Sequence, residues 1–255
     1  MLPIKVNQFM LWIATLLSLA AFTQARAISA ATRELAGVTV VDSPLVRSAE
    51  TYAQQHSSFA VYKHVMRSWL YGVLMINVNQ TLSDNIDLEV HAVSTLLHDL
   101  GWDQDVNSTV VSTDRRFEVD GAIAARDFIR GHGNKNKWNE RRVQLVWDAI
   151  ALHTERSIAF YKELDVQVVS QGIQMDFFGP SYGVTETQYA RVEALFPKND
   201  LRSSVNETLV WLCATKPATT YDTWLQPWGE NHVEGYTVEG RSRYETIFSR
   251  LGGQD

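Results

Sequence analysis

The sequence predicts an all-α fold with one domain. Apolar residues recur at spacings of three and four along most of the chain, and no stretch alternates with the period of two that marks a half-buried strand. Charged side chains make up 20% of the 255 residues, and there are only 14 glycines and 6 prolines. This composition is typical of a globular chain that buries a full-sized core.

The expected helices number about seven or eight and lie between residues 48 and 215. The apolar spacing predicts helices over residues 48–59, 62–75, 87–100, 117–130, 140–154, 165–178, 187–196 and 204–215. Residues 79–85 are polar and predict a surface loop, with Ser83 and Asp84 available to cap the next helix. Ser204 and Glu207, three residues apart, predict a capping box at the start of the last helix.

The chain after Lys216 differs in composition from the helical part. Residues 216–255 are rich in aromatic side chains and loop formers, which predicts an irregular tail packed on the helices. A second domain of about 40 residues without disulfides is less favoured, because so short a chain buries too little surface. We therefore expect an N-terminal extension over 28–47, a helical domain over 48–215 and a tail over 216–255.

The first 27 residues have the pattern of a cleaved signal peptide. Lys5 precedes an apolar run over 9–22, and Ala25 and Ala27 place small residues where a signal peptidase reads them. The run is shorter than the span of about 20 residues that crosses a bilayer comfortably, which favours removal over anchoring. We expect a secreted or secretory-pathway protein with no membrane attachment after cleavage.

Three sequons agree with passage through the secretory pathway. Asn79, Asn107 and Asn206 each begin an Asn-x-Ser/Thr tripeptide, so N-glycans are expected at these positions. Cys213 is the single cysteine, which excludes an intramolecular disulfide. It falls on an apolar helix face with Leu209, which predicts a buried and inert thiol.

The charge pattern excludes a nucleic-acid partner. The net charge is −6, and no block of lysine or arginine is longer than a pair. The expected partner is a small-molecule substrate, and association of the chain into a homo-oligomer stays open.

A histidine directly followed by an aspartate, His98-Asp99, is embedded in an apolar helical stretch. Both side chains can bind a metal, but neighbours on a helix point about 100° apart, so further ligands must come from other elements. His64 is a candidate because it shares a polar helical face with Arg67.

Asp176 is the second unusual carboxylate, because its helical neighbours are apolar. An unpaired buried carboxylate would cost several kcal/mol, so a lysine, an arginine or a metal must lie beside it. Both alternatives stay open at this point. The histidines at 56, 132 and 232 lie in polar surroundings and predict surface side chains, whereas His91 predicts a hydrogen-bonded core histidine.

Four strings in a fixed order carry a family resemblance. The strings are HVMRSWLYG at 64–72, LLHDLGW at 96–102, RFEVDGA at 116–122 and IALHT at 150–154. Together with Asp176 they resemble the HD-domain superfamily of all-helical metal-dependent hydrolases, and more narrowly its fungal cyanamide hydratase branch. The resemblance implies a single HD-domain helical bundle.

The resemblance also implies the metal site. In it, His64, His98, Asp99 and Asp176 hold one divalent ion, with Zn²⁺ favoured and Fe²⁺, Mn²⁺ or Co²⁺ open. Phe117 stands where dinuclear members have a histidine, and phenylalanine cannot bind a metal. A second ion is therefore not expected.

The implied activity is metal-assisted addition of water to a small nitrile-type compound, such as cyanamide, which would give urea. Glu118, with Asp120 as its alternative, is the expected proton carrier, while His153 and Arg67 are expected at the site. One alternative is an HD hydrolase acting on a phosphate ester or amide, although Trp102 replaces the acidic residue of the nucleotidase branch. Another is a non-catalytic protein that the metal stabilises.

Overall fold

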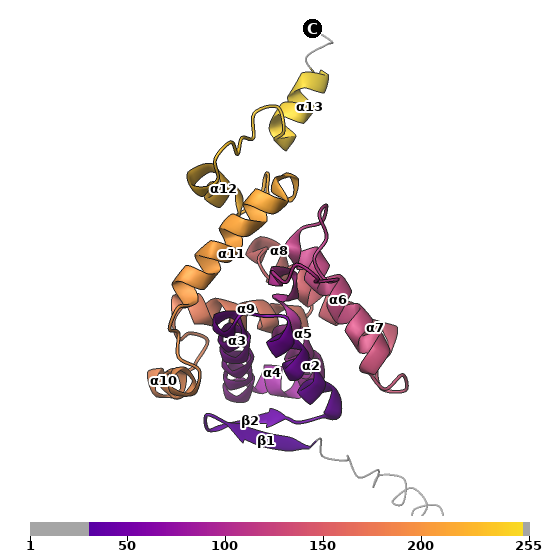
Figure 1. The fold of residues 1–255 in the computed structure, drawn as a ribbon. Helices are drawn as coiled ribbons and strands as arrows, with labels where there is room; N and C mark the ends of the chain where they lie inside the picture. The colour runs from indigo at the N-terminus through magenta and orange to yellow at the C-terminus, as the bar shows by residue number, and fades with distance from the viewer. Residues whose placement is uncertain (1–30, 252–255) are drawn as a thin grey trace, which may run out of the picture. The chain divides into compact units, whose positions relative to one another are not determined.

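The computed structural model describes residues 31–251 (Figure 1). These residues form twelve α-helices, two 3₁₀ turns and one two-stranded sheet, which confirms the predicted all-α class. From Thr32 onward they belong to one compact unit. The predicted signal peptide over 1–27 lies outside the described residues.

The longest connection between elements, residues 103–116, joins η1 to α6. In chain order the elements are β1 (Thr32–Leu35), β2 (Val38–Val41), α2 (Pro44–Gln55), α3 (Phe59–Val78), α4 (Gln80–Asn85), α5 (Leu88–Leu97), η1 (Leu100–Trp102), α6 (Phe117–His132), α7 (Glu140–Ala151), α8 (Arg156–Ala159), α9 (Leu164–Phe178), α10 (Glu186–Leu195), α11 (Leu201–Thr215), η2 (Pro217–Thr219), α12 (Gln226–His232) and α13 (Arg243–Leu251).

Helix α3 is the central element of the bundle. It is 20 residues long and buries side chains on all its faces, as expected for a helix surrounded by others. Its closest neighbour is α9, and a Cβ on Gly172 would lie 2.8 Å from the carbonyl oxygen of Ser68. The missing side chain lets the two backbones approach, which brings His64 on α3 within reach of Asp176 on α9.

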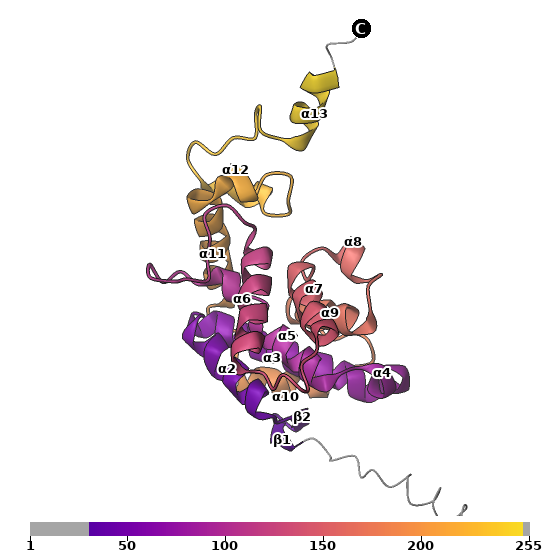
Figure 2. The same cartoon turned by 90° about the vertical axis from the view of Figure 1, so that its right-hand side faces the viewer.

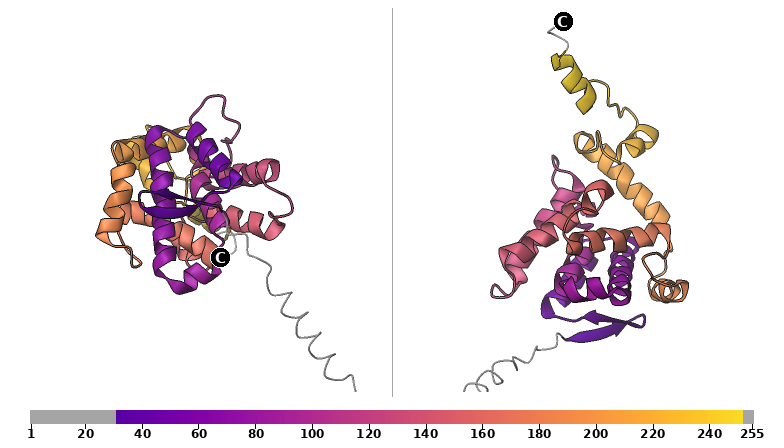
Figure 3. Two further views of the ribbon diagram at one scale, coloured as in Figure 1. Left: turned by 90° about the horizontal axis from the view of Figure 1, so that it is seen from below. Right: turned by 180° about the vertical axis from the view of Figure 1, so that it is seen from behind.

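A β-hairpin precedes the helices and corrects the expectation that no strand is present. Strands β1 and β2 pair antiparallel from Thr32↔Val41 to Leu35↔Val38. The two-residue turn between them has positive φ at Ala36 and Gly37, as hairpins of this length require. β2 buries Val38 and Val40 and contacts α3 and α5. Figure 3 shows the hairpin at one end of the helical bundle. Strands of four residues are too short to show a clear period in the sequence.

Two local expectations at helix ends were wrong. Residues 80–85 form the short helix α4 instead of a loop, and the Asn79 side chain caps it. Ser83 and Asp84 do not cap the next helix, because Asp87 does so through the backbone N–H groups of Glu89 and Val90. A polar stretch next to a capping residue fits a short surface helix as well as a loop.

The start of α11 also differs from the prediction. The helix begins at Leu201 after Asp200, whose φ of 63° is left-handed, so Ser204 lies inside the helix and forms no capping box with Glu207. A capping box does form at Thr185 and Gln188, at the start of α10. The pattern Ser/Thr-x-x-Glu/Gln is short enough to occur inside a helix without capping it.

The tail packs on the helical bundle over its first part and is more helical than expected. Lys216 is buried and its Nζ lies 2.8 Å from a carboxylate oxygen of Asp120 on α6. Leu225 and the half-buried Trp224 join Cys213 of α11 in an apolar cluster. Figure 2 shows α12 beside the end of α11. The buried thiol agrees with the sequence interpretation.

The sequons lie in different settings. Asn79 accepts a hydrogen bond from the backbone of Leu82, and Asn206 on α11 accepts one from the indole N–H of Trp228. Asn107 lies in an exposed loop. None of the helices within 31–251 has the length and apolar character needed to span a membrane.

His91 is a fully buried histidine of the core, as predicted. Its ring lies against Gly72 of α3, where a Cβ would approach within 2.3 Å. Its Nε2 lies 3.5 Å from the Trp69 carbonyl oxygen, while its Nδ1 has no hydrogen-bond partner. Burial lowers the pKa of His91 from 6.5 to about 4, because the apolar surroundings disfavour the charged ring.

We predict that His91 makes the protein less stable as the pH falls. Between pH 6.5 and about 4 the unfolded chain binds a proton at His91 that the folded chain does not, so the free energy of unfolding decreases with falling pH. Urea unfolding at pH 7 and pH 5 measures how much free energy of unfolding each protein loses over this interval. The loss should be about 2 kcal/mol smaller for His91→Leu than for the unchanged protein. Equal losses in both proteins would contradict the prediction.

Candidate metal centre

His98 and Asp99 lie where α5 ends. His98 is the C-cap of α5 with helical φ and ψ, whereas Asp99 has φ −101° and ψ 18° and starts the 3₁₀ turn η1. The backbone leaves the helical conformation at Asp99, so the side chains of the adjacent residues His98 and Asp99 can point toward the same place. η1 packs directly on α6. The two backbones are so close at Gly101 that a Cβ there would lie 2.1 Å from the carbonyl oxygen of Phe117.

His64 from α3 completes a cluster with His98 and Asp99. The Nε2 atoms of the two histidines are 3.2 Å apart, and Oδ2 of Asp99 lies 3.2 Å from His98 Nε2 and 3.6 Å from His64 Nε2. All three side chains are at most 2% exposed. One ligand atom from each lies within 4.8 Å of the others, and among the described residues this is the one such group.

The hydrogen bonds at the far side of each ring fix which nitrogen carries the proton. Nδ1 of His98 lies 2.7 Å from the carbonyl oxygen of Thr95, and Nδ1 of His64 lies 2.6 Å from Oδ2 of Asp176. Both partners only accept, so we assign the protons to the Nδ1 atoms. Each Nε2 therefore directs a lone pair into the cluster, which is the form of histidine that binds metals.

The centre of the cluster contains acceptors and no donor. Both carboxylate oxygens of Asp99 are buried without a hydrogen-bond partner, and the two Nε2 lone pairs lie beside them. Burying such groups without compensation costs several kcal/mol. A cation at this point removes the cost, so the cluster can hold a metal ion.

The pKa shifts of the cluster residues also indicate a site that favours a bound cation. Burial alone would lower the pKa of His98, but the Asp99 carboxylate raises it above its ordinary value. Burial would likewise raise the pKa of Asp99, yet the neighbouring histidines, His98 foremost, hold it below its usual range. The site thus attracts positive charge, for which a metal ion and a proton compete.

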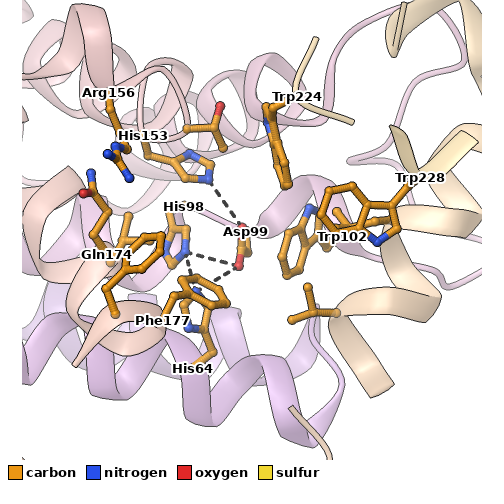
Figure 4. Close-up of a pocket in the computed structure, with 15 residues that line it drawn as sticks. His64, His98, Asp99, Trp102, His153, Arg156, Gln174, Phe177, Trp224 and Trp228 are labelled. Atoms are coloured by element: carbon orange, nitrogen blue, oxygen red, sulfur yellow. Dashed lines mark hydrogen bonds and ion pairs between the residues drawn. The ribbon is translucent and has the colours of Figure 1, made fainter. Parts of the chain in front are cut away.

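His153 faces the cluster from the side of the other Asp99 oxygen (Figure 4). It lies two residues after α7, is buried, and donates from Nδ1 to the carbonyl oxygen of Ile150 at 2.7 Å. Its Nε2 is 3.7 Å from Oδ1 of Asp99. Burial, helped by the nearby His98, lowers its pKa to about 4, so this ring is neutral at pH 7. His153 therefore lies beside the cluster, and its role at the site stays a prediction.

Asp176 lies outside the cluster, contrary to the predicted role as a direct ligand. Its Oδ1 accepts from Arg67 Nε at 2.7 Å, and its Oδ2 accepts from Arg67 Nη2 at 2.8 Å and from His64 Nδ1. Burial would raise the pKa of Asp176, but Arg67 and His64 keep it well below its usual range. Of the two alternatives left open by the sequence, the structure selects the arginine partner.

Arg67 positions this carboxylate and is itself enclosed. Besides its two bonds to Asp176, its Nη1 lies 3.0 Å from the carbonyl oxygen of Phe196. The guanidinium is fully buried and does not line the cavity beside the cluster. Arg67 therefore acts on the site through Asp176 and His64, in the way that outer partners orient metal ligands.

Glu118 does not face the cluster, which corrects its expected role as proton carrier. Its carboxylate accepts from Arg116 at 2.6 Å, from Thr154 Oγ1 at 2.7 Å and from the Trp224 indole at 3.4 Å. Burial would raise its pKa, but Arg116 lowers it below the ordinary value, so Glu118 stays ionised. It holds Thr154 and Trp224, and both of these residues line the cavity.

Asp120, the alternative proton carrier, is also engaged elsewhere. Its oxygens accept from Lys216, from Arg115 and from the backbone and hydroxyl of Ser112. The pair formed with Lys216 ties the tail to α6. The first turn of α6 therefore supplies buried anchors for other segments rather than groups that reach the cluster.

A cavity of about 470 Å³ opens from the cluster (Figure 4). Its lining consists of His64, His98, Asp99, Trp102, His153, Thr154, Arg156, Ile173, Gln174, Phe177, Phe178, Val205, Leu209, Trp224 and Trp228. The sequence reading missed Arg156, Gln174 and Phe177 as site residues. Phe177 follows Asp176 directly, but its apolar side chain gave no signal of a place in the site.

Comparisons with known proteins do not assign a family. No protein-family model matches the chain, and no curated protein matches it. The family resemblance thus stays a prediction from the sequence strings.

We predict that the purified protein binds about one divalent ion per chain through His98 and Asp99. His98→Ala and Asp99→Ala should each lose the ion, because each removes a group whose free atoms face the centre. Elemental analysis after dialysis measures the content. His132→Ala, which removes an exposed histidine outside the cluster, is the control and should retain the ion. Stoichiometric metal in both cluster variants would contradict the site.

We predict that Asp176 supports the metal ion without binding it. Asp176→Asn keeps the shape of the side chain but weakens its hold on the His64 ring, so metal affinity should fall about 10-fold to 100-fold without disappearing. A competition titration with a chromophoric chelator measures this change on protein that still unfolds cooperatively. Complete loss of metal, as in His98→Ala, would instead show that Asp176 is a ligand.

Proposed function

We propose that the chain is a metal-dependent hydratase that adds water to the C≡N group of a nitrile-type compound. The observation that carries the proposal is the position of the cluster: His64, His98 and Asp99, whose two carboxylate oxygens have no hydrogen-bond partner, line one end of a cavity large enough for a small molecule. Three protein ligands with an accessible side are typical of catalytic rather than structural metal sites.

The donor set fits a first-row divalent ion. Two imidazole nitrogens and a carboxylate suit Zn²⁺, Fe²⁺, Mn²⁺ or Co²⁺, and we favour Zn²⁺ because adding water needs no change of oxidation state. When bound, the ion would supply Lewis acidity, which acidifies a water molecule and polarises the nitrile nitrogen.

The protein groups around the cluster provide the remaining requirements. His153 is neutral at pH 7 and offers Nε2 as a proton acceptor close to Asp99, while its Nδ1–H is held by the Ile150 carbonyl. It can take the proton of the added water and return it to the nitrogen, so that oxygen and hydrogen add across C≡N with no leaving group, and the resulting imidic acid then tautomerises to the amide. Cyanamide would give urea in this way.

The alternative function is a hydrolase acting on a phosphate ester or amide. Arg156 is the single lysine or arginine in the cavity lining, and it lies over the ring of Phe178 at 5.5 Å. Phosphate sites usually offer several charged or backbone donors. The apolar and aromatic character of the other walls fits an uncharged substrate better.

We predict that the metal-loaded protein hydrates nitriles and leaves phosphate esters intact. Cyanamide, small nitriles and aromatic nitriles are incubated beside 4-nitrophenyl phosphate and nucleoside monophosphates, and products are identified by mass spectrometry in ¹⁸O-water. His153→Gln should retain the metal and lose about 100-fold to 10,000-fold in rate. His132→Ala is the control with unchanged rate. Release of phosphate with no hydration product would overturn the proposal in favour of the hydrolase.

A further inference from the structure

The cavity is much larger than the reacting group requires. Cyanamide occupies roughly the volume of two water molecules, about 60 Å³, whereas the cavity measures about 470 Å³. A substrate of that size would leave most of the cavity filled with water. The walls beyond the cluster therefore leave room for a larger body attached to the reacting group.

Three tryptophans from two separate segments form one side of the cavity. Trp102 ends η1, Trp224 precedes α12 and Trp228 lies on α12. The rings of Trp224 and Trp228 have centroids 5.7 Å apart and stand at 79° to each other, so they form a corner. Figure 4 shows these indoles beside Asp99, across the cavity from Phe177 and Gln174.

The polar atoms of two of these rings are already engaged. The Trp224 N–H points to Glu118 at 3.4 Å, and the Trp228 N–H donates to Asn206 at 3.2 Å. In addition to their packing, both indoles are therefore held in place by hydrogen bonds to groups that do not line the cavity. What they offer to a ligand is the carbon surface of the rings, which favours another aromatic ring in stacked or edge contact.

Apart from Thr154, Arg156 and Gln174, the remaining walls are also apolar. Ile173 and Phe177 of α9 line the part of the cavity next to the metal cluster. The centroid of the Phe177 ring lies 5.0 Å from that of the His64 ring. Val205 and Leu209 of α11 complete the lining next to the tryptophans. A flat apolar body bound here would have its reactive end at the histidines.

We propose that the cavity binds planar aromatic compounds, and that the substrate of the proposed reaction is an aromatic nitrile rather than cyanamide. The identity of the reaction rests on the proposed function, but binding of the aromatic body does not, because the tryptophan corner lies outside the metal cluster. The ring binds between Trp224, Trp228 and Phe177, and its nitrile group reaches the His64, His98 and Asp99 atoms.

The test compares two nitriles that differ in their rings. Binding of naphthalene-2-carbonitrile and of cyclohexanecarbonitrile to the full chain is measured by calorimetry, with and without prior removal of metal by a chelator. The aromatic compound should bind at least about tenfold tighter. This preference should persist in metal-free protein, because it arises at the tryptophan walls.

Variants locate the binding surface. Trp224→Leu and Trp228→Leu should each weaken naphthalene-2-carbonitrile about tenfold or more, whereas Trp224→Phe keeps a ring and should stay within about threefold of the unchanged protein. Trp147→Leu removes a half-buried tryptophan of α7 outside the cavity lining and is the matched control. If Trp224→Leu does not fold, the single variants Trp228→Leu and Trp224→Phe still test whether binding depends on the aromatic rings.

The outcomes separate this inference from the proposed function. Equal binding of the two nitriles, or unchanged binding in both Trp→Leu variants, would overturn the aromatic site even where cyanamide is hydrated. Tight, tryptophan-dependent binding without turnover of any nitrile would support the aromatic site and overturn the proposed reaction. Hydration of naphthalene-2-carbonitrile with a higher kcat/KM than cyanamide would support both.

Discussion

The buried carboxylate of Asp99 is the constraint on which the site depends. It has no donor for either oxygen, and the nearest groups, His64, His98 and His153, each have the proton on the far nitrogen where an acceptor holds it. The interior is thus arranged so that negative charge and lone pairs meet at one point. Only a cation brought to that point offsets the cost of burying them.

Three further buried ionic groups hold this arrangement in place. Arg67 and Asp176 join α3 to α9 behind His64, and the Phe196 carbonyl ties the same arginine to the end of α10. Glu118 connects α6 to the residue after His153 and to Trp224. Removing one partner from a buried pair leaves an uncompensated charge, so these links fix side-chain positions more strictly than apolar packing alone would. The metal-competent atoms stay aligned because their supports have few alternatives.

Much of the fold could be read from the sequence because its helices bury continuous apolar faces with a regular period. The prediction failed where a segment was short or where partners come from far away. Strands β1 and β2 have four residues each, and α4 has six, so neither period nor length identified them. For the buried carboxylate of Asp176 the sequence predicted either a basic side chain or a metal as its partner. The choice between them required knowing that Arg67 of α3 lies beside Asp176 on α9.

The sequence by itself determined that His98 and Asp99 form a polar pair next to apolar helical residues and that His64 lies on a polar face, because local period fixes which face a residue occupies. The tertiary structure decided which atoms meet. The break between α5 and η1 aims Asp99 at the histidines, and the close approach at Gly172 brings α9 to His64. It also decided that the tail supplies Trp224 and Trp228 to the cavity, since contacts across more than 100 residues leave no periodic trace in a sequence.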